Sequence, residues 1–179
     1  MTKPELTTTL TDKYTHFTNY INSLSADEYM YSHNGKWTAG QQLKHIVICV
    51  KPLVQVFGMD KTAIAKTFGT TDKPGRDYDT LLSEYKSKLS EGGKAPSKYV
   101  PENITTDTRA TLSETLPQLI AALTTRIDTF SEPELDTLCI PHPLLGNISL
   151  REMLYNAIYH VQHHQAIAVE TLKHKPASE

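Results

Sequence analysis

The sequence is poor in cysteine, has no long hydrophobic run and carries no excess of charge of one sign. Its two cysteines, Cys49 and Cys139, cannot form a framework of disulfides, so we expect a reduced, cytoplasmic protein. The longest apolar run, residues 46–50, ends at Lys51, far short of the ~20 residues that a membrane-spanning helix requires. The first residues also lack the charged-then-apolar pattern of a signal peptide. We therefore expect no association with a membrane.

The charges are nearly balanced, with 18 Lys and Arg against 20 Asp and Glu, and no long basic run is present. Because non-specific binding to nucleic acid depends on neutralising phosphates with basic side chains, this balance argues against nucleic acid as a partner. A small-molecule substrate is the expected ligand.

Four segments have the length and apolar spacing of amphipathic helices, and no series of strands is evident. We predict helices over residues 4–23, 38–58, 108–130 and 149–173. Three of them begin with a capping residue followed three positions later by Glu or Gln, at Thr2, Thr38 and Ser149. Pro52 falls inside the second helix, which it is expected to bend or break, and Pro117 falls inside the third, where a kink is expected.

A long connection, residues 59–107, separates the second and third helices and is rich in Gly, Pro, Lys and Thr. It contains one further short helix, predicted over residues 78–89. A crossover of this length allows the second and third helices to run parallel. The sequence thus predicts an all-α protein: a four-helix bundle with a long crossover between the second and third helices, formed by a single domain over residues 1–179.

The last predicted helix carries two histidines on one face, His160 and His164. Four residues correspond to a rotation of about 40° on the helical wheel, and His164 lies in the middle of the apolar stripe. A buried imidazole needs partners for its ring nitrogens, which a metal ion, a tyrosine hydroxyl or a backbone carbonyl can supply. Two histidines on one buried face favour neither a metal site nor core packing decisively. His163 points toward the polar face and is interpreted as a solvated residue or a neighbour of the ligands.

A third histidine, His45, lies in the second predicted helix. That helix is apolar over most of its circumference, so the periodicity does not decide whether His45 faces the bundle or the solvent. Cys49, one turn further on, can be interpreted as a soft metal ligand or a nucleophile, although a small buried apolar side chain is the simpler interpretation.

Two motifs resemble those of the DinB/YfiT-like superfamily of bacterial four-helix-bundle proteins, which are described as metal-dependent enzymes. The first is the segment WTAGQQLKH, in which His45 follows Trp37 by eight residues; the second is the segment HVQHH, residues 160–164, preceded by a turn and the capping residue Ser149. The bundle layout covers essentially the whole chain, whereas the matching motifs cover about a fifth of it. The sequence departs from the family pattern at Val161, where an acidic residue is common, and at Gln165 and Ala166, where a glycine commonly follows the histidine pair.

The resemblance implies a metal site formed by His45, His160 and His164, with zinc as the first expectation and nickel or iron as alternatives. It also implies a homodimer. The function that we expect is a metal-dependent enzyme that activates water or a small thiol, as a hydrolase or a thiol S-transferase; neither a catalytic base nor a substrate is identified. Two alternatives remain open: a non-catalytic metal-binding or structural bundle protein, and nucleic-acid binding, which the charge balance opposes.

Overall fold

Four long helices form the body of the protein in a computed structural model that describes residues 1–102 and 104–176. They are α1 (Lys3–Ser23), α3 (Ala39–Phe57), α6 (Thr108–Ile127) and α8 (Leu150–Leu172). Each of these helices begins and ends within about three residues of its predicted bounds. The predicted all-α bundle is confirmed.

The capping motifs determine where three of these helices begin. The side chains of Thr2, Thr38 and Ser149 each accept a hydrogen bond from the backbone N–H group of the residue three positions later. The side chain of that residue, Glu or Gln, accepts a hydrogen bond from the backbone N–H group of the cap residue. Each motif satisfies two of the backbone N–H groups that the first turn of a helix leaves free. All three predicted helix starts are therefore correct.

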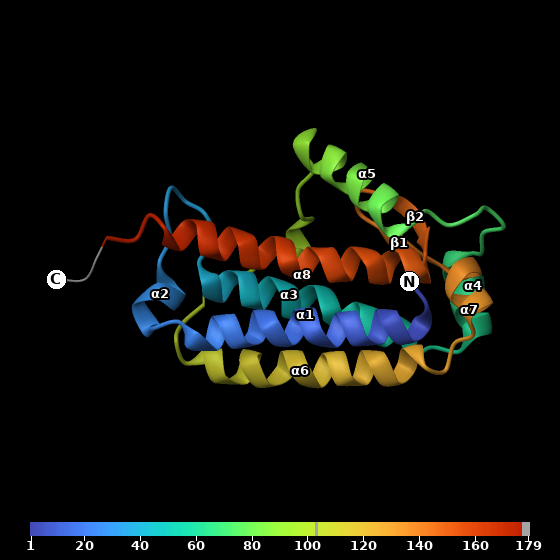
Figure 1. Cartoon of the computed structure of the whole chain (residues 1–179), viewed down its shortest axis with the longest axis horizontal. Helices are drawn as coiled ribbons and strands as arrows, with labels where there is room; N and C mark the ends of the chain where they lie inside the picture. The colour runs from blue at the N-terminus through green and yellow to red at the C-terminus, as the bar shows by residue number, and fades with distance from the viewer. Residues whose placement is uncertain (103, 177–179) are drawn as a thin grey trace.

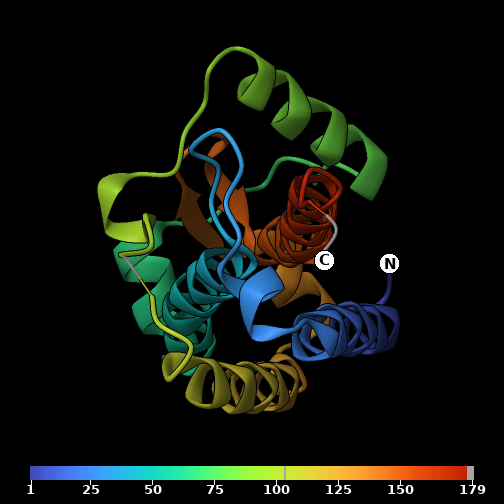
Figure 2. The same ribbon diagram turned by 90° about the vertical axis from the view of Figure 1, so that its left-hand side faces the viewer.

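The helices do not alternate in direction along the chain. In Figure 1, α1 and α8 run one way, whereas α3 and α6 both run the other way. Contacts join α1 to α6, α6 to α3, α3 to α8 and α8 to α1, so the four helices form a closed square, seen end-on in Figure 2. The parallel arrangement of α3 and α6 is the one that the long crossover allows.

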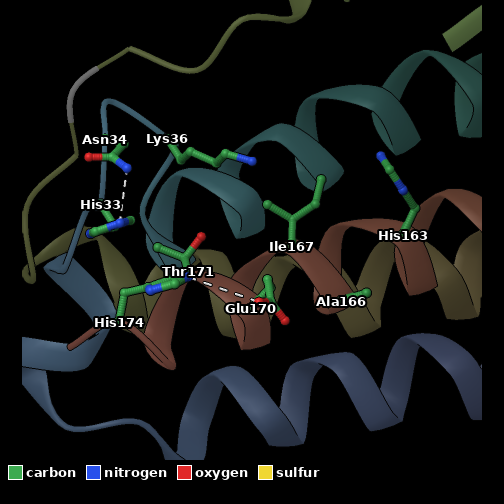
Figure 3. A pocket seen from close by; sticks show the side chains of 9 residues that line it. All are labelled: His33, Asn34, Lys36, His163, Ala166, Ile167, Glu170, Thr171 and His174. Atoms are coloured by element: carbon green, nitrogen blue, oxygen red, sulfur yellow. Dashed lines mark hydrogen bonds and ion pairs between the residues drawn. The ribbon is translucent and has the colours of Figure 1, made fainter. Parts of the chain in front are cut away.

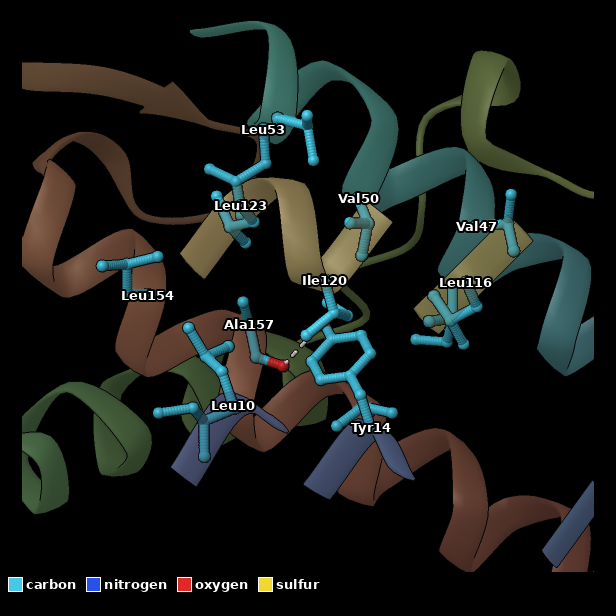
Figure 4. Packing of buried hydrophobic residues seen from close by; sticks show 14 of the residues in the cluster. Leu10, Tyr14, Val47, Val50, Leu53, Leu116, Ile120, Leu123, Leu154 and Ala157 are labelled. Atoms are coloured by element: carbon cyan, nitrogen blue, oxygen red, sulfur yellow. Dashed lines mark hydrogen bonds between the residues drawn. The ribbon is translucent and has the colours of Figure 1, made fainter. Parts of the chain in front are cut away.

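Aliphatic side chains from all four helices fill the centre of the square, as Figure 4 shows for Leu10, Val50, Ile120 and Leu154. One polar group crosses this core: the hydroxyl of Tyr14 donates a hydrogen bond of 3.2 Å to the carbonyl of Ala157. The bond satisfies both groups and ties α1 to α8.

The crossover contains α4 (Lys61–Phe68), α5 (Tyr78–Ser90) and a 3₁₀ turn (Ser97–Tyr99). Only α5 was predicted, and it packs along α8 on the outer side of the bundle, as Figure 1 shows. The 3₁₀ turn contacts α3. The crossover is thus a structured layer over two bundle helices rather than an open loop.

Four short elements lie at the ends of the bundle or before α8, and none was predicted. They are α2 (Ala26–Met30), α7 (Glu132–Thr137) and an antiparallel pair, β1 (Cys139–His142) and β2 (Gly146–Ser149), with Ile140 opposite Ile148. The absence of strands from the prediction was therefore wrong for this hairpin, whose strands of four residues are too short to show a periodicity. Its turn is closed by Gly146, which has a φ of 73°.

Neither internal proline ends its helix, since α3 continues past Pro52 and α6 past Pro117. Of the bend or break expected at Pro52, the break is excluded; the kink expected at Pro117 stays a prediction. Buried side chains follow each proline, including Leu53, Phe57, Ile120 and Leu123, and their packing stabilises the helix beyond the lost backbone bond. No helix in the described ranges is both long and apolar enough to cross a membrane.

Gly40, in the first turn of α3, is required by close packing. A Cβ atom at this position would lie 2.0 Å from Cδ1 of Ile104 and 2.5 Å from the ring of the fully buried Tyr29. We predict that Gly40→Ala lowers the free energy of unfolding by about 1–3 kcal/mol, because the overpacking outweighs the gain in helix propensity.

Gly75 provides the control, because a Cβ atom there would meet no atom within 4 Å. Gly75→Ala should leave the stability unchanged or raise it slightly. Chemical denaturation of the two variants measures both effects, and a Gly40→Ala protein as stable as Gly75→Ala would contradict the packing argument.

Candidate metal centre

The structure brings His45 from α3 together with His160 and His164 from α8. The Nε2 atom of His160 lies 3.2 Å from Nε2 of His45 and 3.0 Å from Nε2 of His164. One nitrogen from each ring lies within 4.8 Å of the other two. His45 and His164 are buried, with exposed fractions of 2% and 7%, so His45 faces the bundle and not the solvent.

Two of the three rings are oriented by hydrogen bonds at their other nitrogen. Nδ1 of His45 donates to the backbone carbonyl of Tyr99, at 2.7 Å, and Nδ1 of His164 donates to the side-chain oxygen of Gln42. Tyr99 belongs to the 3₁₀ turn of the crossover, and Gln42 lies on α3 with an exposed fraction of 1%. A neutral imidazole carries a single N–H group, so both bonds leave a lone pair on Nε2.

These lone pairs are directed at one another across the gap between α3 and α8. His160 can place at most one proton on its Nε2 atom, and that proton can serve only one of the two close nitrogen contacts. At least one lone pair in the cluster therefore has no donor from the three rings. A cation between the three Nε2 atoms would satisfy all of them.

The three imidazoles are held in the neutral form that a metal requires. Burial lowers the pKa of His45, and it lowers the pKa values of His160 and His164 further, with repulsion between the neighbouring imidazoles as the second cause. Two nitrogens bound tetrahedrally to one zinc ion lie about 3.4 Å apart, close to the observed separations. The donor set therefore fits a divalent ion such as zinc, which is bound by neutral imidazole.

Trp37, the only tryptophan of the chain, closes one side of the cluster. Its ring lies nearly parallel to that of His164, with centroids 6.2 Å apart, and 5.1 Å from the ring of His45. The half-buried indole covers this side of the two rings. Its fluorescence also provides an internal probe of the site.

Two other residues that the sequence singled out lie beside the cluster. Cys49 Sγ is 3.6 Å from Nε2 of His45, and burial raises the pKa of its thiol to about 12, which keeps it protonated. His163 is half-buried, and its ring lies 5.4 Å from the ring of His164. Neither side chain belongs to the set of three converging nitrogens.

Gln42 and the carbonyl of Tyr99 were not identified from the sequence. Gln41 is recognised as the partner of the capping residue Thr38, but no pattern identifies its neighbour Gln42 as a partner of His164 before the helix is placed against α8. A backbone carbonyl has no sequence signature at all. Their roles follow only from the three-dimensional contacts of α3.

Comparison with known proteins assigns the chain to a family. The profile of the DinB superfamily matches residues 9–168. The chain belongs to the DinB superfamily. No curated protein matches it.

Among solved structures, the fold is similar to that of YfiT from Bacillus subtilis, described as "a probable metal-dependent hydrolase with an unusual four-helix bundle topology". The TM-score is 0.62 at 17% sequence identity, and the match covers 96% of this chain and 86% of that one. The predicted DinB/YfiT-like identity and fold are confirmed. At this identity the likeness concerns the fold.

The buried histidines make the stability of the metal-free protein dependent on pH. Their pKa values are lower in the folded protein than the ~6.5 of an unfolded chain, so below that pH the unfolded state binds more protons. We predict that the free energy of unfolding falls as the pH drops below about 6.5, by up to about 1.4 kcal/mol per pH unit for each such histidine.

Denaturant titrations at a series of pH values measure this slope. Replacing His160 and His164 together by Gln should reduce it, whereas His16→Gln, at an exposed position outside the cluster, should not. Equal slopes in the double variant and the unmodified protein would contradict the assignment.

Proposed function

We propose that the protein is a metal-dependent enzyme of the hydrolytic kind, in which His45, His160 and His164 hold a divalent ion. The observation that carries the proposal is the convergence of three Nε2 atoms, two of them with their lone pairs fixed by buried hydrogen bonds at Nδ1. Membership of the DinB superfamily and the described nature of YfiT support it.

Three imidazoles leave part of the coordination sphere of a metal to other groups, which is typical of catalytic and not of structural zinc sites. A bound divalent ion supplies Lewis acidity, with which it can polarise a carbonyl group and make a water molecule more acidic. The chain itself holds the three rings neutral and orients two of them, and Trp37 shields the cluster on one side.

Zinc is the ion that we propose first, because neutral imidazole suits it; nickel and iron are alternatives with similar ligand preferences. The proposed substrate is a small molecule. A small thiol as the activated group is a second possibility, which the protonated Cys49 does not supply from within the chain. A homodimer stays a prediction from the family resemblance, and a cytoplasmic setting stays a prediction from the low cysteine content.

A non-catalytic metal-binding protein is the alternative function. The two functions differ in whether the metal has an exchangeable position. Azide added to the cobalt-substituted protein should change its visible absorption spectrum if a position is open; an unchanged spectrum would favour the non-catalytic alternative.

Single substitutions of the three histidines test the proposed ligands. His45→Ala, His160→Ala and His164→Ala should each weaken zinc binding severely and to a similar degree, because each removes one of three protein ligands. His163→Ala should have a milder effect, up to about tenfold, as its ring lies outside the converging set.

Chelator competition on protein produced without an affinity tag measures the zinc affinity, and quenching of Trp37 by cobalt reports occupancy independently. Loss of binding in His163→Ala with retention in His45→Ala would show that the ligands are misassigned.

Gln42 should affect the metal without touching it. Gln42→Leu removes the acceptor that orients His164, so we predict a metal affinity about 10–100-fold lower with all three ligands in place. Gln55→Leu makes the same change at an exposed position of α3 and should leave the affinity unchanged. The same chelator competition compares the two, and equal affinities would exclude an orienting role.

A further inference from the structure

A recess lies beside the metal centre, between the loop that precedes α3 and the last turns of α8. Its volume is about 500 Å³, within the range of small-molecule sites. Figure 3 shows His33 and Lys36 on the loop side and Ile167 and Thr171 on α8. Two contacts fix the loop to the helix end: the rings of His33 and His174 stack at 4.3 Å, and the hydroxyl of Tyr31 donates to the carbonyl of His174.

One cation and one carboxylate line this recess, Lys36 and Glu170. Figure 3 shows the side chain of Lys36 extending along the recess toward Ile167. Within the described ranges, no carboxylate lies within ion-pair distance of Lys36. The carboxylate of the lining, Glu170, is paired with Lys173 at 2.7 Å and lies 4.0 Å from the ring of His174, which also lines the recess. Because Lys36 forms no ion pair among the described residues, its ammonium group can bind an anion of a ligand.

Further hydrogen-bonding groups adjoin Lys36. The side-chain amide of Asn34 donates to Nε2 of His33, so the N–H group of that ring is at Nδ1 and available as a donor. Thr171 has an exposed fraction of 5%, and its hydroxyl has no hydrogen-bond partner in the part of the chain that the structure describes. In Figure 3 this hydroxyl is directed toward the side on which Lys36 lies. An unpaired buried hydroxyl is unfavourable, and a ligand acceptor at the floor would relieve it.

One end of the recess lies beside the metal centre. Ile167 and Ala166 provide an apolar floor, and His163 forms the end opposite the loop. The ring of His163 lies 5.4 Å from that of His164, so this end of the recess adjoins one of the three metal-binding rings.

We propose that this recess binds the carboxylate of a small organic acid, with the anion at Lys36, the apolar body over Ile167 and the opposite end directed past His163 to the metal. The inference rests on the proposed function for the metal but assigns a separate set of residues. It identifies the substrate class as a short aliphatic compound with a carboxylate at the end remote from the reacting bond.

Diacids and their matching monoacids test the proposal. Succinate, adipate and suberate carry a carboxylate at each end and can join the metal to Lys36, whereas butanoate, hexanoate and octanoate carry only one. Calorimetric titration of the zinc-loaded protein should show tighter binding of at least one diacid than of its monoacid. In Lys36→Met this advantage should fall by about fivefold, since the ion pair is solvent-exposed, and it should weaken at high salt.

Lys66→Met is the matched control, because Lys66 is exposed on α4 at the opposite end of the bundle. It should preserve the advantage. The same titrations on metal-free protein should retain a weak binding of monoacid that depends on Lys36.

Failure of the recess and failure of the metal centre give different results. If zinc binds normally but diacids and monoacids bind equally, or Lys36→Met has no effect, the recess proposal is overturned and the metal site stands. If zinc does not bind, the proposed function fails, and the titration of metal-free protein decides the recess: binding of hexanoate that Lys36→Met weakens supports it, and no binding overturns it.

Discussion

The metal centre depends on two buried hydrogen bonds that lie on the far side of the histidine rings. His45 and His164 use their only N–H groups to bind the carbonyl of Tyr99 and the side chain of Gln42. Each bond satisfies a buried donor, and each leaves the lone pair of Nε2 facing the other helix. Without these acceptors the rings could turn or change tautomer, and the buried nitrogens would have to bond to one another. The acceptors thus convert three polar side chains, two of them buried where a polar group is costly, into one site for a cation.

The path of the crossover determines where one of these acceptors, the carbonyl of Tyr99, lies. Because α3 and α6 run parallel, the chain must return along the whole length of α3, about 28 Å for 19 residues, before α6 begins. This return passes over α3 and α8, where it places the 3₁₀ turn with Tyr99 against His45. An immediate hairpin between α3 and α6 would provide no segment at this position. The bundle topology and the orientation of His45 are therefore linked.

The long helices could be predicted because their signals are local. The caps at Thr2, Thr38 and Ser149 and the apolar stripes need no tertiary information. Pro52 does not break its helix, because packing further along α3 outweighs a local penalty. The short hairpin had too few residues for a pattern. The face of α3 that carries His45 could not be read from its sequence, since the helix is buried on most sides. Only the family resemblance distinguished His45, and no sequence signal pointed to Gln42.

The structure of α8 explains two departures from the family pattern, at Val161 and Gln165. Val161 follows the first histidine of the motif, and its side chain is fully buried in the hydrophobic core, with an exposed fraction of 0%. A carboxylate at this position would lose its hydration without a partner, so the apolar residue fits this bundle. Gln165 pairs instead with His16 of α1, at an exposed position. Both residues therefore stabilise the contact between α1 and α8, and neither replaces a hydrogen bond to the three histidines. The acceptors come from α3 and the crossover, so α8 can differ at these positions while the orientation of the metal-binding rings is preserved.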